Sequence, residues 1–443
     1  MRYLTKISFG LMVISFFGPV GLSRLAHAAG RVNAQVTTAS MCDKLNDMTD
    51  EQREQFGVVD ASCVANNPEL TAHTFVLGCH NCAGATYSSN GSLVNTSVLH
   101  KIPTSYLLKM PENWNGKFVV VIPPGRADQP ADHVTFWSQP FMNALLNEGY
   151  AAAVMDNPTP GSAIFPYEDF ISSYSTKDNR NGYLATGHQL KDLVTDIFGA
   201  PAGTYGLGYS RGVLRGAGFL VDEAGAPFDG YVLVSGGNGV FNTMLTHIEA
   251  FKTNLAPLTN LTPFETTAAV RIFSLVAAIA PADPEYRAYI LSGSTEEERL
   301  ERAMAYDVSE RPKDVRREWG KAEYGPELKK PTINIHGLKD LVLYPIEALK
   351  FSERVIEADR SDVYRLYLVR DMPHAVPQSV FLDSIHKLDA WVQNSAEPGP
   401  LDASEFGLQQ SCTALSLGTD PLDCFCAVMG GVDFASNPIP ECG

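Results

Sequence analysis

A short segment in the middle of the chain combines a nucleophilic side chain with two glycines. It reads Gly208-Tyr209-Ser210-Arg211-Gly212 and is the only G-x-S-x-G pattern in the sequence. The preceding residues, 203–208, are typical of a strand, and residues 213–222 are typical of a helix. A serine on a sharp strand-to-helix turn presents its hydroxyl away from the backbone. Ser210 is therefore the candidate nucleophile, and the alternative is an ordinary turn serine that caps the helix.

A serine hydroxyl needs a neighbouring base to take its proton. His374 is the candidate base, because it lies in a loop directly after a predicted strand at 363–370. Asp340 is the candidate acid that would orient the imidazole, because it follows a predicted strand at 331–336. Asp371, three residues before His374, is the second candidate for the acid. These residue types together indicate nucleophilic acyl transfer.

Strand and helix patterns alternate from residue 104 onward, as in a mostly parallel, doubly wound α/β sheet. The predicted strands lie at 104–110, 117–123, 150–155, 203–208, 230–235, 331–336 and 363–370. Helical patterns lie between or after them at 133–147, 181–198, 213–222, 346–357 and 378–393. The turn-rich residues 111–116 predict a hairpin-like link between the first two strands. Such a sheet would bring the ends of its strands, and the candidate residues, to one edge.

The chain resembles the α/β-hydrolase fold family over roughly 104–394, through the serine turn and the order Ser, Asp, His. The resemblance implies a Ser210-Asp340-His374 triad, no cofactor, no metal, and two backbone donors for an oxyanion. The amide of Arg211 is the first expected donor. The second should follow the strand at 117–122, where the chain reads Pro123-Pro124-Gly125-Arg126. Proline has no N–H, so the donor is Gly125 or Arg126, with Arg126 the better match.

The ends of the chain predict further segments. Residues 1–28 have a basic start, an apolar stretch and an Ala-His-Ala site, which predicts a signal peptide; a membrane anchor is the alternative. A cysteine-containing extension follows at 29–100, and a cysteine-rich tail occupies 395–443. The hydrolase core is predicted at 101–237 and 329–394, interrupted by a helical cap insertion at 238–328. A chain of this organisation is expected to be secreted or periplasmic.

Charge and cysteine content limit the class of protein. The formal net charge of −16 argues against nucleic acid or anionic lipid as a partner, and no later segment is apolar enough for membrane insertion. In an exported chain an even number of cysteines predicts disulfides that tie the terminal extensions, with the pairing left open. A zinc site at 79–82 is the weaker alternative. The eight cysteines are Cys42, Cys63, Cys79, Cys82, Cys412, Cys424, Cys426 and Cys442.

The predicted activity is hydrolysis of a small-molecule or polymeric carboxylic ester. The acyl and alcohol groups and the oligomeric state are left open by the sequence. A serine peptidase of the same fold is the first alternative, with Glu249, Asp283 or Glu285 anchoring a substrate amine. A secreted binding protein that keeps the fold without turnover is the second.

Overall fold

In the computed structural model the described residues all belong to the second of two units, Ala39–Gly443, and the first unit, Met1–Thr38, lies outside them. The described residues are 40–80, 86–87, 93–95, 104–123, 139–156, 177–210, 212–213, 217–236, 283–320, 325–340, 343, 345–374, 376–395, 398 and 410–413. The predicted signal peptide and both predicted oxyanion donors, Arg126 and Arg211, lie outside them.

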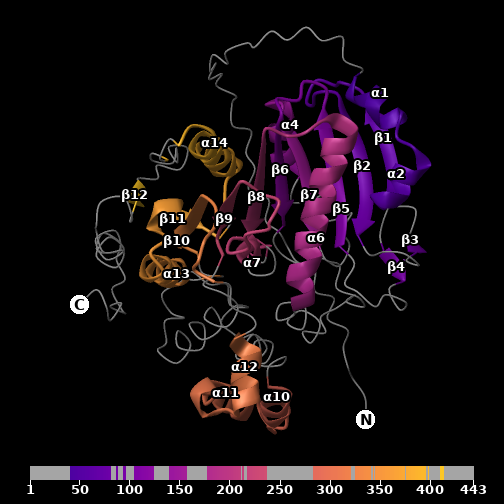
Figure 1. The fold of residues 1–443 in the computed structure, drawn as a ribbon. Helices are drawn as coiled ribbons and strands as arrows, with labels where there is room; N and C mark the ends of the chain where they lie inside the picture. Colours follow the sequence, from indigo (N-terminus) through magenta and orange to yellow (C-terminus); the bar gives the residue numbers. More distant parts are fainter. Residues whose placement is uncertain are drawn as a thin grey trace. The chain divides into compact units, whose positions relative to one another are not determined.

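Ten strands of the described part form one sheet in the order β1-β2-β5-β7-β6-β8-β9-β10-β11-β12 (Figure 1). The first five along the chain are β1 Val58–Val64, β2 His73–His80, β5 Thr104–Pro111, β6 Lys117–Ile122 and β7 Ala151–Asp156. The others are β8 Gly203–Tyr209, β9 Gly230–Val234, β10 Thr332–Lys339, β11 Tyr364–Pro373 and β12 Gln410–Thr413. Two short strands, β3 Thr86–Tyr87 and β4 Leu93–Asn95, pair separately.

The centre of the sheet is parallel. Neighbouring strands from β7 through β6, β8, β9 and β10 to β11 all run in the same direction. Strands β1, β2, β5 and β12 pair with their neighbours antiparallel. Five of the six residues of β6 are buried, as expected of a strand covered on both faces. The prediction of a mostly parallel α/β sheet is confirmed.

The predicted hairpin between the first two core strands is wrong. Strand β5 pairs with β2 and β7, so β7 lies between β5 and β6. β6 pairs with β7 on one side and with β8 on the other, and the two hydrophobic cores cover its apolar residues on both faces. Residues 111–116 therefore connect β5 to β6 across the position that β7 occupies, instead of joining two adjacent strands.

Helices lie along the same chain. The longer ones that pack on the sheet are α4 Gln139–Asn147, α6 Lys177–Leu193, α13 Pro345–Glu357 and α14 Gln378–Asn394, and α6 continues as the π-helical η1 Val194–Phe198. The shorter ones are α1 Met41–Asn46, α2 Asp50–Gln55, α7 Gly218–Leu220, η4 Val308–Glu310 and η5 Ser361–Val363. Three more are α10 Pro284–Leu291, α11 Glu296–Met304 and α12 Lys313–Gly320. No helix of the described residues has the length and apolar character needed to span a bilayer.

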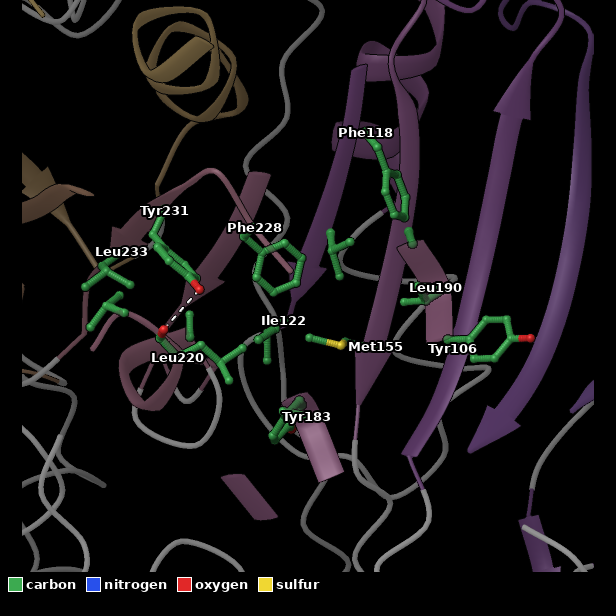
Figure 2. Close-up of a cluster of buried hydrophobic side chains, with 14 of the residues drawn as sticks. Tyr106, Phe118, Ile122, Met155, Tyr183, Leu190, Leu220, Phe228, Tyr231 and Leu233 are labelled. Atoms are coloured by element: carbon green, nitrogen blue, oxygen red, sulfur yellow. Dashed lines mark hydrogen bonds between the residues drawn. The ribbon is translucent and has the colours of Figure 1, made fainter. Parts of the chain in front are cut away.

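The sheet has a hydrophobic core on each face. One core joins the strands to α6, α7 and α13 through residues such as Leu190, Leu220 and Phe351. Figure 2 shows part of it, including the Tyr231 hydroxyl, which donates a 3.0 Å hydrogen bond to the carbonyl of Leu220. The other core joins the strands to α4 and α14 through residues such as Met142 and Ile385. Helices on both faces make the sheet doubly wound, as predicted.

Strands begin earlier in the chain than the sequence indicated. Residues 29–100 have sparse periodicity, yet α1, α2, β1 and β2 form within them and extend the sheet. None of the seven residues of β1 is buried, because it is an edge strand paired only with β2, so it lacks an apolar alternation. A disulfide between Cys42 and Cys63 ties α1 to β1. Cys79 is also disulfide-bonded, which removes it as a zinc thiolate.

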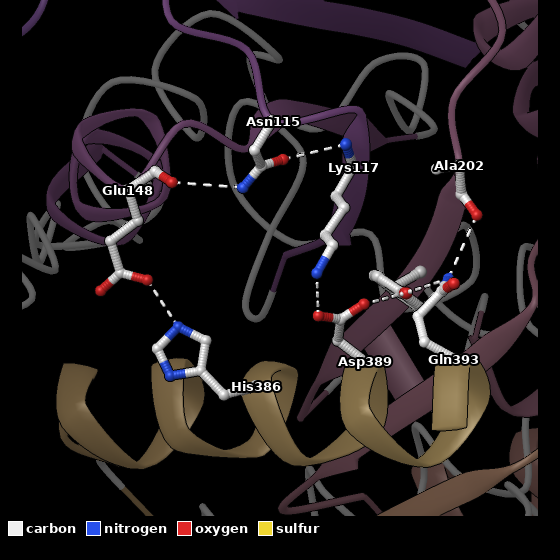
Figure 3. A network of polar contacts seen from close by, with 8 residues as sticks. Asn115, Lys117, Glu148, Ala202, His386, Asp389 and Gln393 are labelled. Atoms are coloured by element: carbon white, nitrogen blue, oxygen red, sulfur yellow. Dashed lines mark hydrogen bonds and ion pairs between the residues drawn. The ribbon is translucent and has the colours of Figure 1, made fainter. Parts of the chain in front are cut away.

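A polar network fastens α14 to the amino ends of β6 and β8 (Figure 3). Asp389 forms an ion pair with Lys117 at the start of β6. The other oxygen of Asp389 accepts a 2.5 Å hydrogen bond from the Tyr205 hydroxyl on β8. Nearby, His386 contacts Glu148 with 2.5 Å between Nε2 and Oε2. These contacts fix α14 to the amino-terminal part of the strands, at the opposite end of β8 from Ser210.

Candidate active site

Ser210 occupies a strained turn at the carboxyl end of β8. Its φ of 52° lies in the left-handed region that residues other than glycine rarely adopt. Two backbone hydrogen bonds fix the turn, from Ser210 N to Val234 O at 2.8 Å and from Val213 N to Ser210 O at 2.9 Å. Such strain persists only where the surrounding structure imposes it, and it concentrates at functional sites.

The two glycines of the motif allow close backbone packing around the serine. A Cβ atom at Gly212 would overlap the carbonyl oxygen of Ile122 at the end of β6. A Cβ at Gly208 would lie 2.6 Å from the Cβ of Ala217. The turn is thus pressed against the end of β6 on one side and against the following helical residues on the other.

His374 contacts both Ser210 and Asp340. Its Nε2 lies 2.8 Å from Ser210 Oγ, and its Nδ1 lies 2.8 Å from Asp340 Oδ2. An ionised carboxylate only accepts hydrogen bonds, so Nδ1 carries the proton and Nε2 accepts from the serine hydroxyl. The histidine side chain is 23% exposed and the aspartate is fully buried. The structure therefore brings the three predicted residues together in one hydrogen-bonded row.

Asp340 is held as a buried anion. Its Oδ1 accepts a 2.9 Å hydrogen bond from the backbone N–H of Leu343. Burial alone would raise the pKa of Asp340. The hydrogen bond from His374 and the nearby imidazoles have a larger, opposite effect, so the pKa of Asp340 lies below its ordinary value. Asp371, the second candidate acid, lies within β11, and it is Asp340 that meets His374.

Close approach of β10 and β11 brings the acid and the base together. The two strands are parallel, with a register shift between Gly337 and Lys339 that pairs Lys339 with Pro373. A Cβ at Gly337 would overlap the carbonyl oxygen of Met372. Glycine is needed here for contact, and the contact places the residues after each strand side by side.

Two neighbours of these residues make contacts that the sequence did not predict. The Tyr209 hydroxyl donates a 2.5 Å hydrogen bond to the backbone carbonyl of His374. His336, fully buried on β10, has its Nε2 2.7 Å from Leu343 O and 3.4 Å from Asp340 Oδ2. Tyr209 and His374 are 165 residues apart, so no local pattern predicts their contact. The position of His336 at the end of a strand, four residues before Asp340, was the available signal for the second contact.

The remaining site predictions have mixed outcomes. The oxyanion donors Arg211 and Arg126 lie outside the described residues and stay predictions. Another histidine, His386, lies on α14 and contacts Glu148. Within the described part of the chain, no group of three or more His, Cys, Asp or Glu side chains has the arrangement of a metal site.

Comparison with known proteins finds similar structures. They include feruloyl esterase B from Aspergillus oryzae, with 12% identity over 81% of this chain and 92% of that chain and a TM-score of 0.48. Lipase A from Candida antarctica in its closed state has 13% identity, coverage of 78% and 84%, and a TM-score of 0.44. Tannin acyl hydrolase from Aspergillus niger has 12% identity, coverage of 85% and 93%, and a TM-score of 0.45. No protein-family model and no curated protein sequence matches the chain.

The architecture itself identifies the fold. A mostly parallel sheet carries helices on both faces, and Ser210 lies on a strained turn directly after a central strand. Asp340 and His374 follow later strands, in the chain order Ser, Asp, His. The chain has the α/β-hydrolase fold that its sequence resembles.

Proposed function

We propose that this protein is a serine hydrolase that cleaves carboxylic esters through an acyl-enzyme. The observation that carries the proposal is the hydrogen-bonded row Ser210–His374–Asp340, with 2.8 Å at each contact of the imidazole. The row supplies a nucleophile, a base and an acid that orients the base, and a serine needs such partners to react at neutral pH.

The first half of the reaction forms the acyl-enzyme. Ser210 Oγ attacks the ester carbonyl carbon while its proton moves to His374 Nε2. Asp340 stabilises the imidazolium without taking its proton. The amides of Arg211 and Arg126 are the proposed donors to the tetrahedral oxyanion. Collapse of this intermediate breaks the bond to the alcohol, which leaves with the proton from Nε2.

The second half returns the free enzyme. Water gives a proton to His374 Nε2 and attacks the acyl carbon, and collapse then releases the carboxylic acid and restores the Ser210 hydroxyl. This sequence needs no bound cofactor, because Ser210 supplies the nucleophile and His374 accepts and returns each proton.

The peptidase alternative loses one of its proposed anchors. Asp283 is buried and caps α10 by accepting from Tyr286 N at 3.0 Å. It also pairs with Arg311, whose Nε lies 2.5 Å from Oδ2. Both carboxylate oxygens are engaged within the helices at 283–320, which leaves Asp283 unsuited to bind a substrate amine. Glu285 in the first turn of α10 is untouched by this observation, and Glu249 lies outside the described residues, so the peptidase remains the alternative.

Export is part of the proposal. The disulfide Cys42–Cys63 suits an oxidising compartment, and it agrees with the signal-peptide pattern at 1–28. We therefore propose that the mature protein acts outside the cytoplasm, as a secreted or periplasmic enzyme.

The proposed nucleophile is tested with p-nitrophenyl acetate and butyrate. Wild-type protein should hydrolyse them, and Ser210→Ala should lower kcat by at least about 10³-fold, because removal of a triad member disables the whole unit. Ser309→Ala, an exposed serine in η4, is the matched control and should retain full activity.

A second measurement separates the possible failures. A fluorophosphonate probe should label wild-type protein at Ser210 and leave Ser210→Ala unlabelled. Labelling without ester turnover, together with cleavage of a peptide substrate, would favour the peptidase. Absence of both turnover and labelling would contradict the hydrolase proposal and leave the binding protein.

A further inference from the structure

Tyr209 contacts the histidine loop from the residue next to the nucleophile. Its hydroxyl donates a 2.5 Å hydrogen bond to the backbone carbonyl of His374, 165 residues away in the chain. Burial raises the pKa of the Tyr209 phenol, so it stays protonated and keeps its hydrogen to donate.

The ring of Tyr209 packs against two other aromatic side chains. Its centroid lies 5.7 Å from that of the His374 imidazole, in a tilted arrangement. It also packs edge-on against Phe381 of α14, with 5.3 Å between centroids. The phenol is therefore positioned by aromatic contacts that do not depend on the hydrogen bond to His374.

These contacts close a ring of bonds around the reacting atoms. Ser210 and Tyr209 are joined by a peptide bond, and the Tyr209 hydroxyl donates a hydrogen bond to the His374 carbonyl. His374 Nε2 in turn lies 2.8 Å from Ser210 Oγ. Asp340 fixes the imidazole at Nδ1, which sets the direction of the ring. The bond from Tyr209 fixes the backbone from which the imidazole extends, and this sets its distance from the serine.

We propose that Tyr209 is a positioning residue for the base, acting through the backbone of His374 and not on the substrate. The proposal rests on the proposed function, in which His374 takes the serine proton. Without the hydroxyl, His374 keeps its two side-chain hydrogen bonds and its packing against the Tyr209 ring, but its backbone carbonyl loses the hydrogen bond to β8. Small displacements of a reacting group lower rates steeply while leaving substrate binding nearly unchanged.

The test compares Tyr209→Phe with Tyr205→Phe. Both variants remove only a hydroxyl from β8, and each hydroxyl donates one 2.5 Å hydrogen bond, to His374 O and to Asp389 Oδ1 respectively. Tyr205 lies four residues earlier on the strand, about 13 Å away at the rise of a parallel strand. Tyr209→Phe should lower kcat about tenfold with little change in KM. Tyr205→Phe should lower the thermal midpoint and keep kcat.

A spectroscopic readout judges the inference without substrate. The proton shared by His374 Nδ1 and Asp340 gives a far-downfield NMR resonance, assigned by its loss in His374→Gln. It should broaden or shift in Tyr209→Phe and stay unchanged in Tyr205→Phe. An unchanged resonance in Tyr209→Phe overturns the inference, whatever the rates are. If wild-type protein fails to hydrolyse esters, the proposed function fails, and the resonance still decides the role of Tyr209.

Discussion

At the scale of single residues, the acid of the proposed triad has a second imidazole beside it. His336 Nε2 and Asp340 Oδ2 lie 3.4 Å apart, and both side chains are fully buried. Burial lowers the pKa of His336, against the opposing effect of the Asp340 charge and the Leu343 carbonyl. A neutral His336 leaves the negative charge of Asp340 available to His374. A charged His336 would form an ion pair with Asp340 and weaken the interaction between Asp340 and His374.

The buried His336 should make the protein sensitive to acid. Unfolded, this imidazole takes up a proton near its ordinary pKa of 6.5, whereas in the fold it does so only at lower pH. Between these values the unfolded state binds more protons, so the free energy of unfolding falls as the pH drops below 6.5. In His336→Gln this part of the decrease should vanish. Urea unfolding at pH 8 and pH 5.5 measures the difference.

His386 provides a control of opposite sign. Its hydrogen bond to Glu148 raises the pKa of His386, so its contribution is fully present below the ordinary pKa and is lost as the pH rises through the raised value. His386→Gln should therefore make the acid loss of stability steeper, where His336→Gln makes it shallower. Equal slopes in the two variants would contradict this assignment of the two histidines.

At the scale of elements, the sequence predicted the strands whose residues are buried on both faces. β6 and β9 appear as apolar runs because helices cover both surfaces of the sheet, and such runs can be recognised without knowledge of the neighbouring strands. The order of the strands in the sheet was harder to predict. The position of β7 between β5 and β6 depends on which surfaces remain to be covered, and this is a property of the whole sheet.

The candidate site divides in the same way. Ser210, Asp340 and His374 were predictable because each follows a strand at a characteristic place in the chain. The hydrogen bond from Tyr209 to His374 joins residues 165 apart in the chain, and such a contact produces no periodic pattern in the sequence from which it could be predicted. The exposed edge strand β1 was missed because no residue in it is buried, so burial imposed no pattern on its sequence.

The packing of the serine turn against β6 predicts a sharp effect at Gly212. Gly212→Ala would place a Cβ on the carbonyl oxygen of Ile122, so either the turn or the strand end must move. We expect a loss of about 2 kcal/mol in stability and a decrease of at least about tenfold in kcat. Denaturant unfolding and ester hydrolysis measure the two effects.

Gly225→Ala is the matched control, since a Cβ there meets nothing within 4 Å. It should leave both stability and kcat close to the wild-type values. If Gly212→Ala behaved like Gly225→Ala, the close contact between the turn and β6 would not determine the geometry of Ser210.

At the scale of the whole molecule, the disulfide Cys42–Cys63 ties the amino-terminal elements together. The cysteines are 21 residues apart, and closing such a loop stabilises a protein by about 3 kcal/mol. The double variant Cys42→Ser, Cys63→Ser should unfold at lower temperature and keep kcat, because the bond joins α1 to β1 and not to the serine turn. Thermal unfolding with and without reductant gives the measurement.

Adding reductant to the double variant distinguishes the contribution of the Cys42–Cys63 disulfide to stability from that of other disulfides. Cys79 is also disulfide-bonded, so reductant should destabilise the double variant further. A variant as stable as wild type would show that the bond adds nothing to the fold. A variant of normal stability and low kcat would show that the amino-terminal elements reach the site.

The order of the catalytic candidates along the chain also governs when activity can arise during synthesis. Ser210 and His374 are 164 residues apart, and β9, β10 and β11 enter the sheet in chain order between them. A growing chain that has completed β8 carries the nucleophile but no base. On the proposed function, Ser210 has no base until β11 adds beside β10, so ester hydrolysis can begin only after residue 374 has been synthesised.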